Sequence, residues 1–456
     1  MELLTHKSPK RKFFIESIFI VLVALVTVFA CEVEEPIPTD PLKDFFGYKV
    51  APNAKQLGGR YWENLPVPMD LMVYKFQAPP SGRTHNGNSG NVVAGDFNLD
   101  GWVDIFSPGM VHAGNVNVTT SFLIWSPSKK IFEDKNYLNN KSVSLAELNA
   151  VRAVPAYLNG DDYVDVVIFG FSDEGIFDSK RYPVTLMLSD GKGGFDLKEI
   201  TTEIPISQHE GGDVGDLNGD KIPDLVVNSG ALMKILWGSS SSPYFSESNS
   251  ATFVGAIHSP YNNDNGFGET CIECVFDYIG NSKIVDINND GQNDLVLNGN
   301  DINSPNRILI NLGNGRFNKN SIIYLPNSVT PGVFTMNKDY IFDDLNSDGK
   351  LDIIALNVNS NYSWWNYLPY IQQNDGSFII DKSYVVTDFT KTSTSFISRE
   401  RLIHTDMNGD GKKDIIYLEM NDMNQLKDKT ALIRTGNRFL EQPFYQFDVY
   451  AKSLIN

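Results

Sequence analysis

Histidine, cysteine and catalytic motifs are scarce in this chain, and their scarcity excludes several kinds of site. Its 456 residues contain three Cys and six His, and these His are scattered along the chain. No Gly-x-Ser-x-Gly, His-Glu-x-x-His or phosphate-cradling loop occurs. Cys271 and Cys274 form a single CxxC with no second pair or His pair nearby, so a zinc site is not predicted. The sequence therefore identifies no catalytic residue.

Positive charge and helical periodicity are also in short supply. Lys and Arg number 38 against 56 Asp and Glu, which gives a formal net charge of −18. Nucleic acid is therefore not an expected partner, because phosphate recognition needs basic patches. No stretch after residue 31 shows sustained helical periodicity, whereas 36 Gly, 22 Pro and 12% aromatic residues suit short strands joined by turns. The chain is predicted to be almost entirely β.

A targeting segment precedes the part expected to fold. The basic stretch 7–12 is followed by an apolar run, Phe13–Ala30, that stops at Cys31. The sequence Val-Phe-Ala-Cys at this point resembles the bacterial lipobox, which implies that Cys31 is lipidated after cleavage. The alternative is an uncleaved transmembrane anchor. The small residue before a lone Cys and the acidic, Pro-containing segment behind it favour cleavage.

The segment after Cys31 indicates where the protein is sent. Glu32, Glu34 and Glu35 resemble the acidic export tag of surface lipoproteins in the Bacteroidetes. We expect a lipoprotein signal peptide over 1–30, an acidic linker over 31–45 and one folded domain over 46–456. The expected location is the surface of the bacterial outer membrane, with the lipid as the membrane contact. In an exported chain, Cys271 and Cys274 favour a local disulfide over a redox role.

One pattern, Asp-x-Asn-x-Asp-Gly-x-x-Asp followed by an apolar run, recurs along the chain. Five copies carry acids at positions 1, 5 and 9 and Asn at position 3: Asp96, Asn98, Asp100, Asp104; Asp216, Asn218, Asp220, Asp224; Asp286, Asn288, Asp290, Asp294; Asp344, Asn346, Asp348, Asp352; and Asp406, Asn408, Asp410, Asp414. A sixth, degraded copy has Tyr157 at position 1. The copies begin 58 to 70 residues apart, a period that suits a four-stranded blade.

Each repeat unit also contains an apolar strand and a hairpin. The strand after the acidic segment is a continuous apolar run, as in Leu225–Val227, Leu295–Leu297 and Ile353–Leu356. Continuous runs indicate burial on both faces of a sheet. A hairpin follows, clearest in Arg307–Phe317, where Gly-Asn-Gly supplies a left-handed turn. Four strands per unit and six units predict a β-propeller.

The acidic segment, the apolar strand and the Gly-x-Gly-x-Phe hairpin resemble the FG-GAP/VCBS repeats of integrin-α-type propellers, over about residues 90 to 445. The resemblance implies an all-β propeller of four-stranded antiparallel blades with Asp-rich calcium loops. Residues 46–90 are too short for a full blade, but they can combine with Phe444–Lys452. Seven blades are therefore predicted, with six as the alternative.

The repeated acids fit calcium, which takes about six to eight hard oxygen ligands. One ion can be wrapped by the side chains at positions 1, 3 and 5, a carbonyl near position 7 and a carboxylate at position 9. Gly at position 6 permits the sharp turn, and Lys221 replaces it in the copy that begins at Asp216. We predict about five structural Ca²⁺ ions, with weak or no binding at the degraded copy. The leader has a net charge of +2, so its removal changes the formal net charge from −18 to −20. Five bound Ca²⁺ ions would bring the net charge of the mature chain to −10.

Two other kinds of loop share part of this acidic pattern. An EF-hand loop begins in the same way but needs Glu at position 12 and flanking helices. Position 12 is not acidic in any copy: Ser107, Val227, Leu297, Ala355 and Tyr417. The second alternative is that Asp, Asn and Gly simply favour turns. Five copies with clustered acids argue against it, because carboxylates so close together would repel one another without a cation.

Ligand binding is expected at the end of the propeller opposite the acidic segments, where longer loops emerge. In 359–367 the aromatic residues Tyr362, Trp364, Trp365 and Tyr367 have the composition of a sugar-stacking surface; the alternative is that they pack between blades. Met110–Thr120 and His258–Glu273 are further candidate loops. The preferred function is a non-catalytic binding module for glycan or protein ligands. A polysaccharide lyase or hydrolase and a purely structural adhesion scaffold are the alternatives.

Overall fold

The computed structural model describes residues 93–443, with gaps at 109, 113–115, 119, 130, 144, 146–149, 171–182, 201–210, 230–231, 255–278, 300–305, 327–334, 360–363, 387–390, 393–402, 406–411 and 421–425. The predicted leader, the linker, Cys31 and the segments assigned to a seventh blade lie outside the described residues. So do Cys271 and Cys274.

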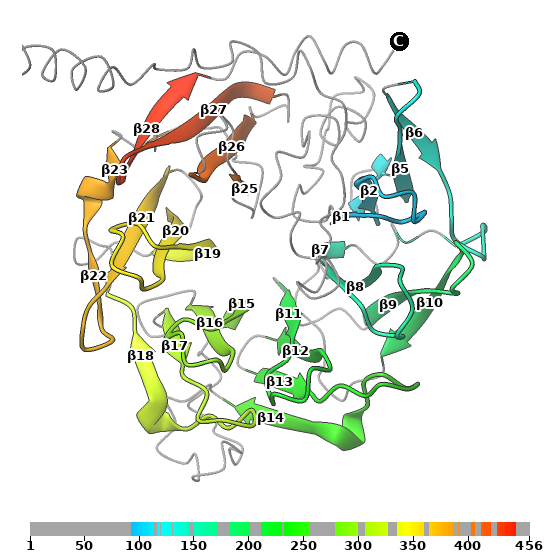
Figure 1. Cartoon of the computed structure of the whole chain (residues 1–456), viewed down its shortest axis with the longest axis horizontal. Helices are drawn as coiled ribbons and strands as arrows, with labels where there is room; N and C mark the ends of the chain where they lie inside the picture. The colour runs from blue at the N-terminus through cyan, green and yellow to red at the C-terminus, as the bar shows by residue number, and fades with distance from the viewer. Residues whose placement is uncertain are drawn as a thin grey trace, which may run out of the picture. The chain divides into compact units, whose positions relative to one another are not determined.

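Six sheets follow one another along the described residues, and they are numbered here in chain order (Figure 1). Sheet 1 contains β1 (Val93–Gly95), β2 (Asp104–Ser107), β5 (Ser121–Ser126) and β6 (Ile131–Lys135). Sheet 2 contains β7 (Ala150–Ala156), β8 (Asp165–Gly170), β9 (Val184–Ser189) and β10 (Phe195–Ile200). Sheet 3 contains β11 (Gly212–Gly215), β12 (Asp224–Ser229), β13 (Leu232–Leu236) and β14 (Ser250–Val254).

Sheet 4 contains β15 (Ile279–Val285), β16 (Asp294–Gly299), β17 (Arg307–Leu309) and β18 (Ile322–Tyr324). Sheet 5 contains β19 (Thr335–Asp343), β20 (Asp352–Asn359), β21 (Trp364–Gln372) and β22 (Phe378–Ile380), and β24 (Lys391–Thr392) pairs with β21. Sheet 6 contains β25 (Ile403–Thr405), β26 (Asp414–Met420), β27 (Leu426–Thr435) and β28 (Arg438–Pro443), with β23 (Val385–Val386) parallel to β28. A separate pair, β3 (Met110–His112) and β4 (Val116–Val118), lies between β2 and β5 in the chain.

Each sheet packs against the next one through a shared apolar core. The second strands explain this arrangement, because both of their faces are buried. In β12, Leu225 and Val227 pack into the core shared with sheet 2, and Val226 packs into the core shared with sheet 4. The first strands of sheets 1 to 5 also contact one another in succession. The prediction that continuous apolar strands are buried on both faces is confirmed here.

The all-β prediction is confirmed for the described residues, whose helical segments include the short 3-10 turns Glu247–Asn249, Lys319–Ser321 and Lys382–Tyr384. In the part of the chain that the structure describes, no helix has the length and apolar character needed to span a membrane. Six of the described sheets have four or five strands, and the predicted seventh blade falls on residues outside the described ones.

The hairpin expected at Arg307–Phe317 is longer than predicted. The left-handed turn is present, with φ values of +92°, +57° and +68° at Gly313, Asn314 and Gly315. The partner strand of β17 is β18, however, which begins only at Ile322. Phe317 instead turns inward and is buried in the core between sheets 3 and 4, because burial of its ring outweighs continued pairing.

Candidate metal centres

The acidic repeats occupy the same place in every sheet: they join the first strand to the second. We call them acid loops 1 to 6, after their sheets, and number their residues from 1 to 9. Acid loops 1 to 5 begin at Asp96, Tyr157, Asp216, Asp286 and Asp344. In acid loop 6 the predicted ligands Asp406, Asn408 and Asp410 lie outside the described residues, and Asp414 begins β26.

The backbone of acid loops 1, 3, 4 and 5 turns through two left-handed residues. Position 6 is left-handed at Gly101, with φ of +82°, and also at Lys221, with φ of +67°. The expected turn at position 6 is therefore present with or without Gly. Position 4 is left-handed too, at Leu99, with φ of +57°, and at Asn289 and Ser347. This second turn was not predicted, because Leu and Ser rarely adopt that conformation, although Gly160 and Gly219 stand at position 4 of acid loops 2 and 3, each with φ of +84°.

The structure brings the side chains at positions 1, 3 and 5 together in acid loops 1, 3, 4 and 5. In acid loop 1, the Asp100 N–H donates to Asp96 Oδ1 at 3.1 Å and to Asn98 Oδ1 at 3.0 Å. The Gly101 N–H donates to Asp96 Oδ2 at 2.8 Å. Acid loops 4 and 5 repeat this pattern. The loop backbone thus binds the side-chain oxygens of positions 1 and 3, and metal ligation by positions 1, 3 and 5 stays a prediction.

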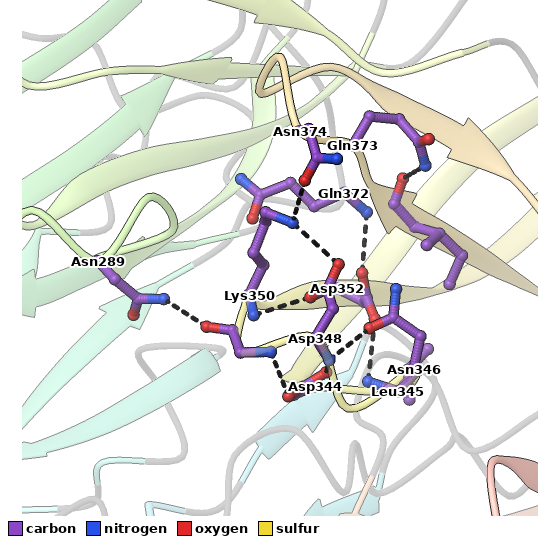
Figure 2. A network of polar contacts seen from close by, with 12 residues as sticks. Asn289, Asp344, Leu345, Asn346, Asp348, Lys350, Asp352, Gln372, Gln373 and Asn374 are labelled. Atoms are coloured by element: carbon purple, nitrogen blue, oxygen red, sulfur yellow. Dashed lines mark hydrogen bonds and ion pairs between the residues drawn. The ribbon is translucent and has the colours of Figure 1, made fainter.

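Acid loop 5, drawn in Figure 2, contains a cation of its own. Lys350, at position 7, places Nζ 2.9 Å from Asp348 Oδ2 and 2.9 Å from Asn374 Oδ1. This hydrogen bond and the nearby positive charge hold the pKa of the exposed Asp348 carboxyl below its usual value. Lys350 therefore competes with any metal ion for one of the two acids at positions 1 and 5.

The carboxylate at position 9 has a structural task that sequence reasoning missed. Asp104 is fully buried, and it accepts the Phe97 N–H on Oδ2 at 3.1 Å and the Trp125 N–H on Oδ1 at 2.8 Å. It therefore joins position 2 of its loop to the end of the third strand. The same pair of bonds forms in the next four sheets, at Asp165, Asp224, Asp294 and Asp352. Metal ligation by position 9 stays a prediction.

Burial controls the ionisation of the position-9 acids. Desolvation raises the pKa of Asp104 to about 8, against the lowering effect of the Trp125 and Phe97 N–H groups, and the charges of Asp100 and Asp96 raise it further. Desolvation also raises the pKa values of Asp165, Asp224 and Asp294 to about 6. A nearby cation would offset this cost, because it favours the charged form.

The donor set fits calcium in its chemistry, since positions 1, 3 and 5 supply two carboxylates and an amide oxygen. Over the described ranges, no three His, Cys, Asp or Glu side chains are grouped so that they could hold a metal ion. An ion in an acid loop would therefore depend on the Asn amide and on backbone carbonyls beside the two acids.

The structure describes the backbone of three of the four aromatic candidates and the side chain of Tyr367. The segment 359–367 was predicted as a loop, but Trp364, Trp365 and Tyr367 lie in β21, where Trp365 pairs with Val358 and Lys391. Tyr367 is 4% exposed and packs in the core between sheets 5 and 6. For this residue the alternative of packing between blades holds, because its ring faces the neighbouring sheet. Tyr362 lies outside the described residues.

The other two candidate loops also differ in outcome. Met110–Thr120 contains the β3–β4 hairpin, in which His112 pairs with Val116. Its base is closed by the Thr120 hydroxyl, which donates to the Pro108 carbonyl at 2.9 Å. His258–Glu273 lies outside the described residues.

No family model and no curated protein match the sequence. Among solved structures, the chain is similar to an Agrocybe aegerita lectin described as recognising non-reducing terminal N-acetylglucosamine, with 15% identity over 77% of this chain and 80% of the lectin, at a TM-score of 0.49. It is also similar to the Tc holotoxin pore of Photorhabdus luminescens, with 13% identity over 78% of this chain and 15% of that chain, at a TM-score of 0.27. At these TM-scores neither likeness identifies the ligand of this chain.

The role of position 9 can be tested in acid loop 2, which has no acid at position 1. Replacing Asp165 with Ala leaves the buried Leu158 and Ser189 N–H groups without their acceptor. We expect a loss of about 2–4 kcal/mol in the free energy of unfolding, equal with calcium and with EGTA, measured by urea denaturation. A loss that appears only with calcium would contradict a purely structural role at this position.

The raised pKa values predict how stability depends on pH when calcium is removed. Between the usual Asp value of 3.8 and the folded value of about 8 for Asp104, the folded chain retains a proton that the unfolded chain has lost. The free energy of unfolding therefore falls as pH rises through this window. We expect the melting temperature in EGTA to decrease from pH 5 to pH 8 and calcium to reduce that slope. A melting temperature that rises with pH in EGTA would contradict this.

Proposed function

We propose that this chain is a calcium-stabilised β-propeller of the FG-GAP/VCBS type that serves as a non-catalytic binding module for glycan or protein ligands. The observation that carries the proposal is the acid loop itself. It recurs at the same connection in successive sheets, and its backbone turns the side chains at positions 1, 3 and 5 inward. A turn motif needs no such repeated set of carboxylates.

Calcium is the cation that best suits these loops. The side chains at positions 1, 3 and 5 and the position-7 carbonyl are hard oxygen donors, which Ca²⁺ prefers. Each of acid loops 1, 3, 4 and 5 contains two acids four residues apart, at positions 1 and 5. A third acid, at position 9, is buried beside them. Binding of a divalent cation would relieve their repulsion and fix the connection between two strands.

The succession of packed sheets supports a propeller. Sheets 1 to 6 contact their neighbours in chain order through five shared cores. We propose that residues 46–90 and 444–452 complete a seventh blade, with six blades as the alternative. The predicted lipid at Cys31 would tether this propeller to the surface of the bacterial outer membrane.

Ligands would bind at the strand ends far from the acid loops. In sheet 5, Gln372 at one end of β21 donates its N–H to Asp352 of acid loop 5 at 2.8 Å. Trp364 begins the same nine-residue strand, so its backbone lies about 26 Å away at the rise of an extended strand. The β3–β4 hairpin likewise follows the end of β2 that is remote from acid loop 1. Each Trp ring at this end would offer an apolar face to sugar C–H groups.

Metal analysis of the purified chain tests the calcium proposal. We expect about five bound Ca²⁺ ions per chain and a melting temperature that falls when EGTA is added, because the loop carboxylates then repel one another. Replacing Asp220 with Asn, at position 5 of acid loop 3, should remove one ion.

The matched control is Asp161→Asn, at position 5 of acid loop 2, where Tyr157 replaces the first acid. This variant should keep the wild-type calcium content. A purified protein without bound calcium, whose melting temperature is the same with EGTA, would overturn the proposal.

A glycan array tests the binding role. We expect the Trp364→Ala/Trp365→Ala variant to lose glycan binding by about ten-fold or more, since each lost stacking contact weakens binding, while its melting temperature stays close to wild type. Trp237→Ala is the control, because Trp237 precedes Gly238, whose N–H binds Asp224 at the acid-loop end. Wild-type binding by the double variant would refute the stacking role.

A further inference from the structure

Side chains at the acid-loop end of the third strand reach across to the neighbouring sheet. In sheet 4, the Asn311 N–H donates to Asp294 Oδ1 of its own sheet at 2.7 Å. The Asn311 side-chain Nδ2 donates at 2.7 Å to the Leu217 carbonyl, at position 2 of acid loop 3. Asn311 is 3% exposed. One residue therefore links the position-9 acid of its own sheet to the acid loop of the sheet before it.

The next two sheets repeat this contact with other side chains. In sheet 5, Gln372 Nε2 donates to the Ile287 carbonyl of acid loop 4 at 3.4 Å. In sheet 6, the backbone N–H of Arg434 donates to Asp414 Oδ1 at 2.7 Å. The Arg434 side-chain Nη2 donates to two carbonyls of acid loop 5, that of Asp344 at 2.7 Å and that of Leu345 at 3.5 Å. The donors differ in chemistry, but the place in the fold is the same.

These contacts form a continuous chain of hydrogen bonds, because each position-2 residue that accepts from the next sheet also donates its own N–H to the position-9 acid of its sheet. We call this set the inter-loop chain. Its members, in order, are Asp224, Leu217, Asn311, Asp294, Ile287, Gln372, Asp352, Leu345, Arg434 and Asp414. All four of its acids are fully buried.

A second set of contacts joins the same loops at their surface. Asn293 Nδ2 donates to the Asp216 carbonyl, at position 1 of acid loop 3, at 2.7 Å. Asn289 Nδ2 donates to the Gly349 carbonyl, at position 6 of acid loop 5, at 3.2 Å, as Figure 2 shows. Acid loop 4 is therefore bonded to both of its neighbours.

The inter-loop chain does not extend to acid loop 2. The residue of sheet 3 that corresponds to Asn311 is Gly238, whose N–H donates to Asp224 Oδ1 at 2.8 Å. Glycine has no side chain that could reach the preceding sheet. Acid loop 1 thus provides an internal reference, separated from the inter-loop chain by this break.

We propose that acid loops 3, 4 and 5 bind calcium as a coupled row, in which an ion in one loop raises the affinity of the next, with Asn311 and Gln372 as positioning residues. The proposal rests on the calcium binding proposed above. The cross-sheet bonds of Asn311 and Gln372 end on the position-2 carbonyl of the neighbouring acid loop, beside position 1, so ordering one loop fixes part of its neighbour in advance. The neighbour then loses less conformational entropy when it binds its own ion, which is positive coupling.

Loop-resolved hydrogen–deuterium exchange during a calcium titration tests the coupling, with the full chain and Ca²⁺ alone as the probe. Each acid loop gives its own midpoint, the calcium concentration at half protection. The Asp290→Asn variant weakens the site in acid loop 4. We expect its midpoints in acid loops 3 and 5 to rise about five-fold or more, while the midpoint of acid loop 1 stays at the wild-type value.

Cutting the contacts on one side of acid loop 4 makes the test specific. The triple variant Asn289→Gly/Asp290→Asn/Gln372→Met has the weakened site in acid loop 4 and lacks the contacts of that loop with acid loop 5. Its midpoint in acid loop 5 should equal that of the Asn289→Gly/Gln372→Met variant, whereas its midpoint in acid loop 3 should stay raised. Gln373→Met is the matched control for Gln372, because Gln373 Nε2 donates to the Ile371 carbonyl of its own sheet at 3.0 Å. It should leave the coupling intact. If Gln372→Met impairs folding, Asn289→Gly alone, at an exposed residue, should reduce part of the rise that Asp290→Asn causes in the calcium midpoint of acid loop 5.

The two proposals fail in different ways. If no loop of the wild-type chain gains protection with calcium, both are overturned. If every loop responds to calcium but Asp290→Asn leaves the midpoints of acid loops 3 and 5 unchanged, the coupling is wrong and calcium binding stands. A shift of equal size in acid loop 1 would also overturn the coupling, since it would reflect general destabilisation.

Discussion

The buried carboxylate at position 9 is the interaction on which the rest of this structure depends. It accepts one N–H from its loop and one from the end of the third strand, so a single side chain joins the connection between strands 1 and 2 to strand 3. Acid loop 2 shows that this bond does not need a full acid set, because Asp165 makes it beside Tyr157. The fold therefore separates support of the loop, at position 9, from the candidate ion site, at positions 1, 3 and 5.

This separation has an electrostatic cost. Desolvation disfavours the charged form of the position-9 acid, and the acids at positions 1 and 5 add repulsion. The two backbone N–H bonds offset only part of this cost, as the raised pKa values indicate. A cation bound in each loop would remove the repulsion and stabilise the same strand connection that position 9 supports. Strand pairing and apolar burial hold each sheet together, whereas the raised pKa values of the position-9 acids make its stability depend on pH.

The sequence predicted well what depends on neighbouring residues in the chain. The buried strands at Leu225–Val227 and Leu295–Leu297, the turn at position 6 and the four-strand unit all follow from local periodicity and Gly placement. It predicted poorly what depends on contacts between sheets. Burial of Tyr367, the two N–H bonds of Asp104 and the reach of Asn311 into acid loop 3 involve partners up to 94 residues apart. The left-handed Leu99 was missed because its residue type argues against that conformation.

The central claim is that the acid loops hold calcium between the side chains at positions 1, 3 and 5, and that position 9 keeps its backbone bonds whether or not it also ligates the ion. Crystals grown with calcium and measured for anomalous scattering would locate each ion directly. The account predicts one peak inside each of acid loops 1, 3, 4, 5 and 6, no peak of similar height in acid loop 2, and Asp104 still bonded to Phe97 and Trp125. Empty acid loops at saturating calcium, or ions found only elsewhere, would contradict it.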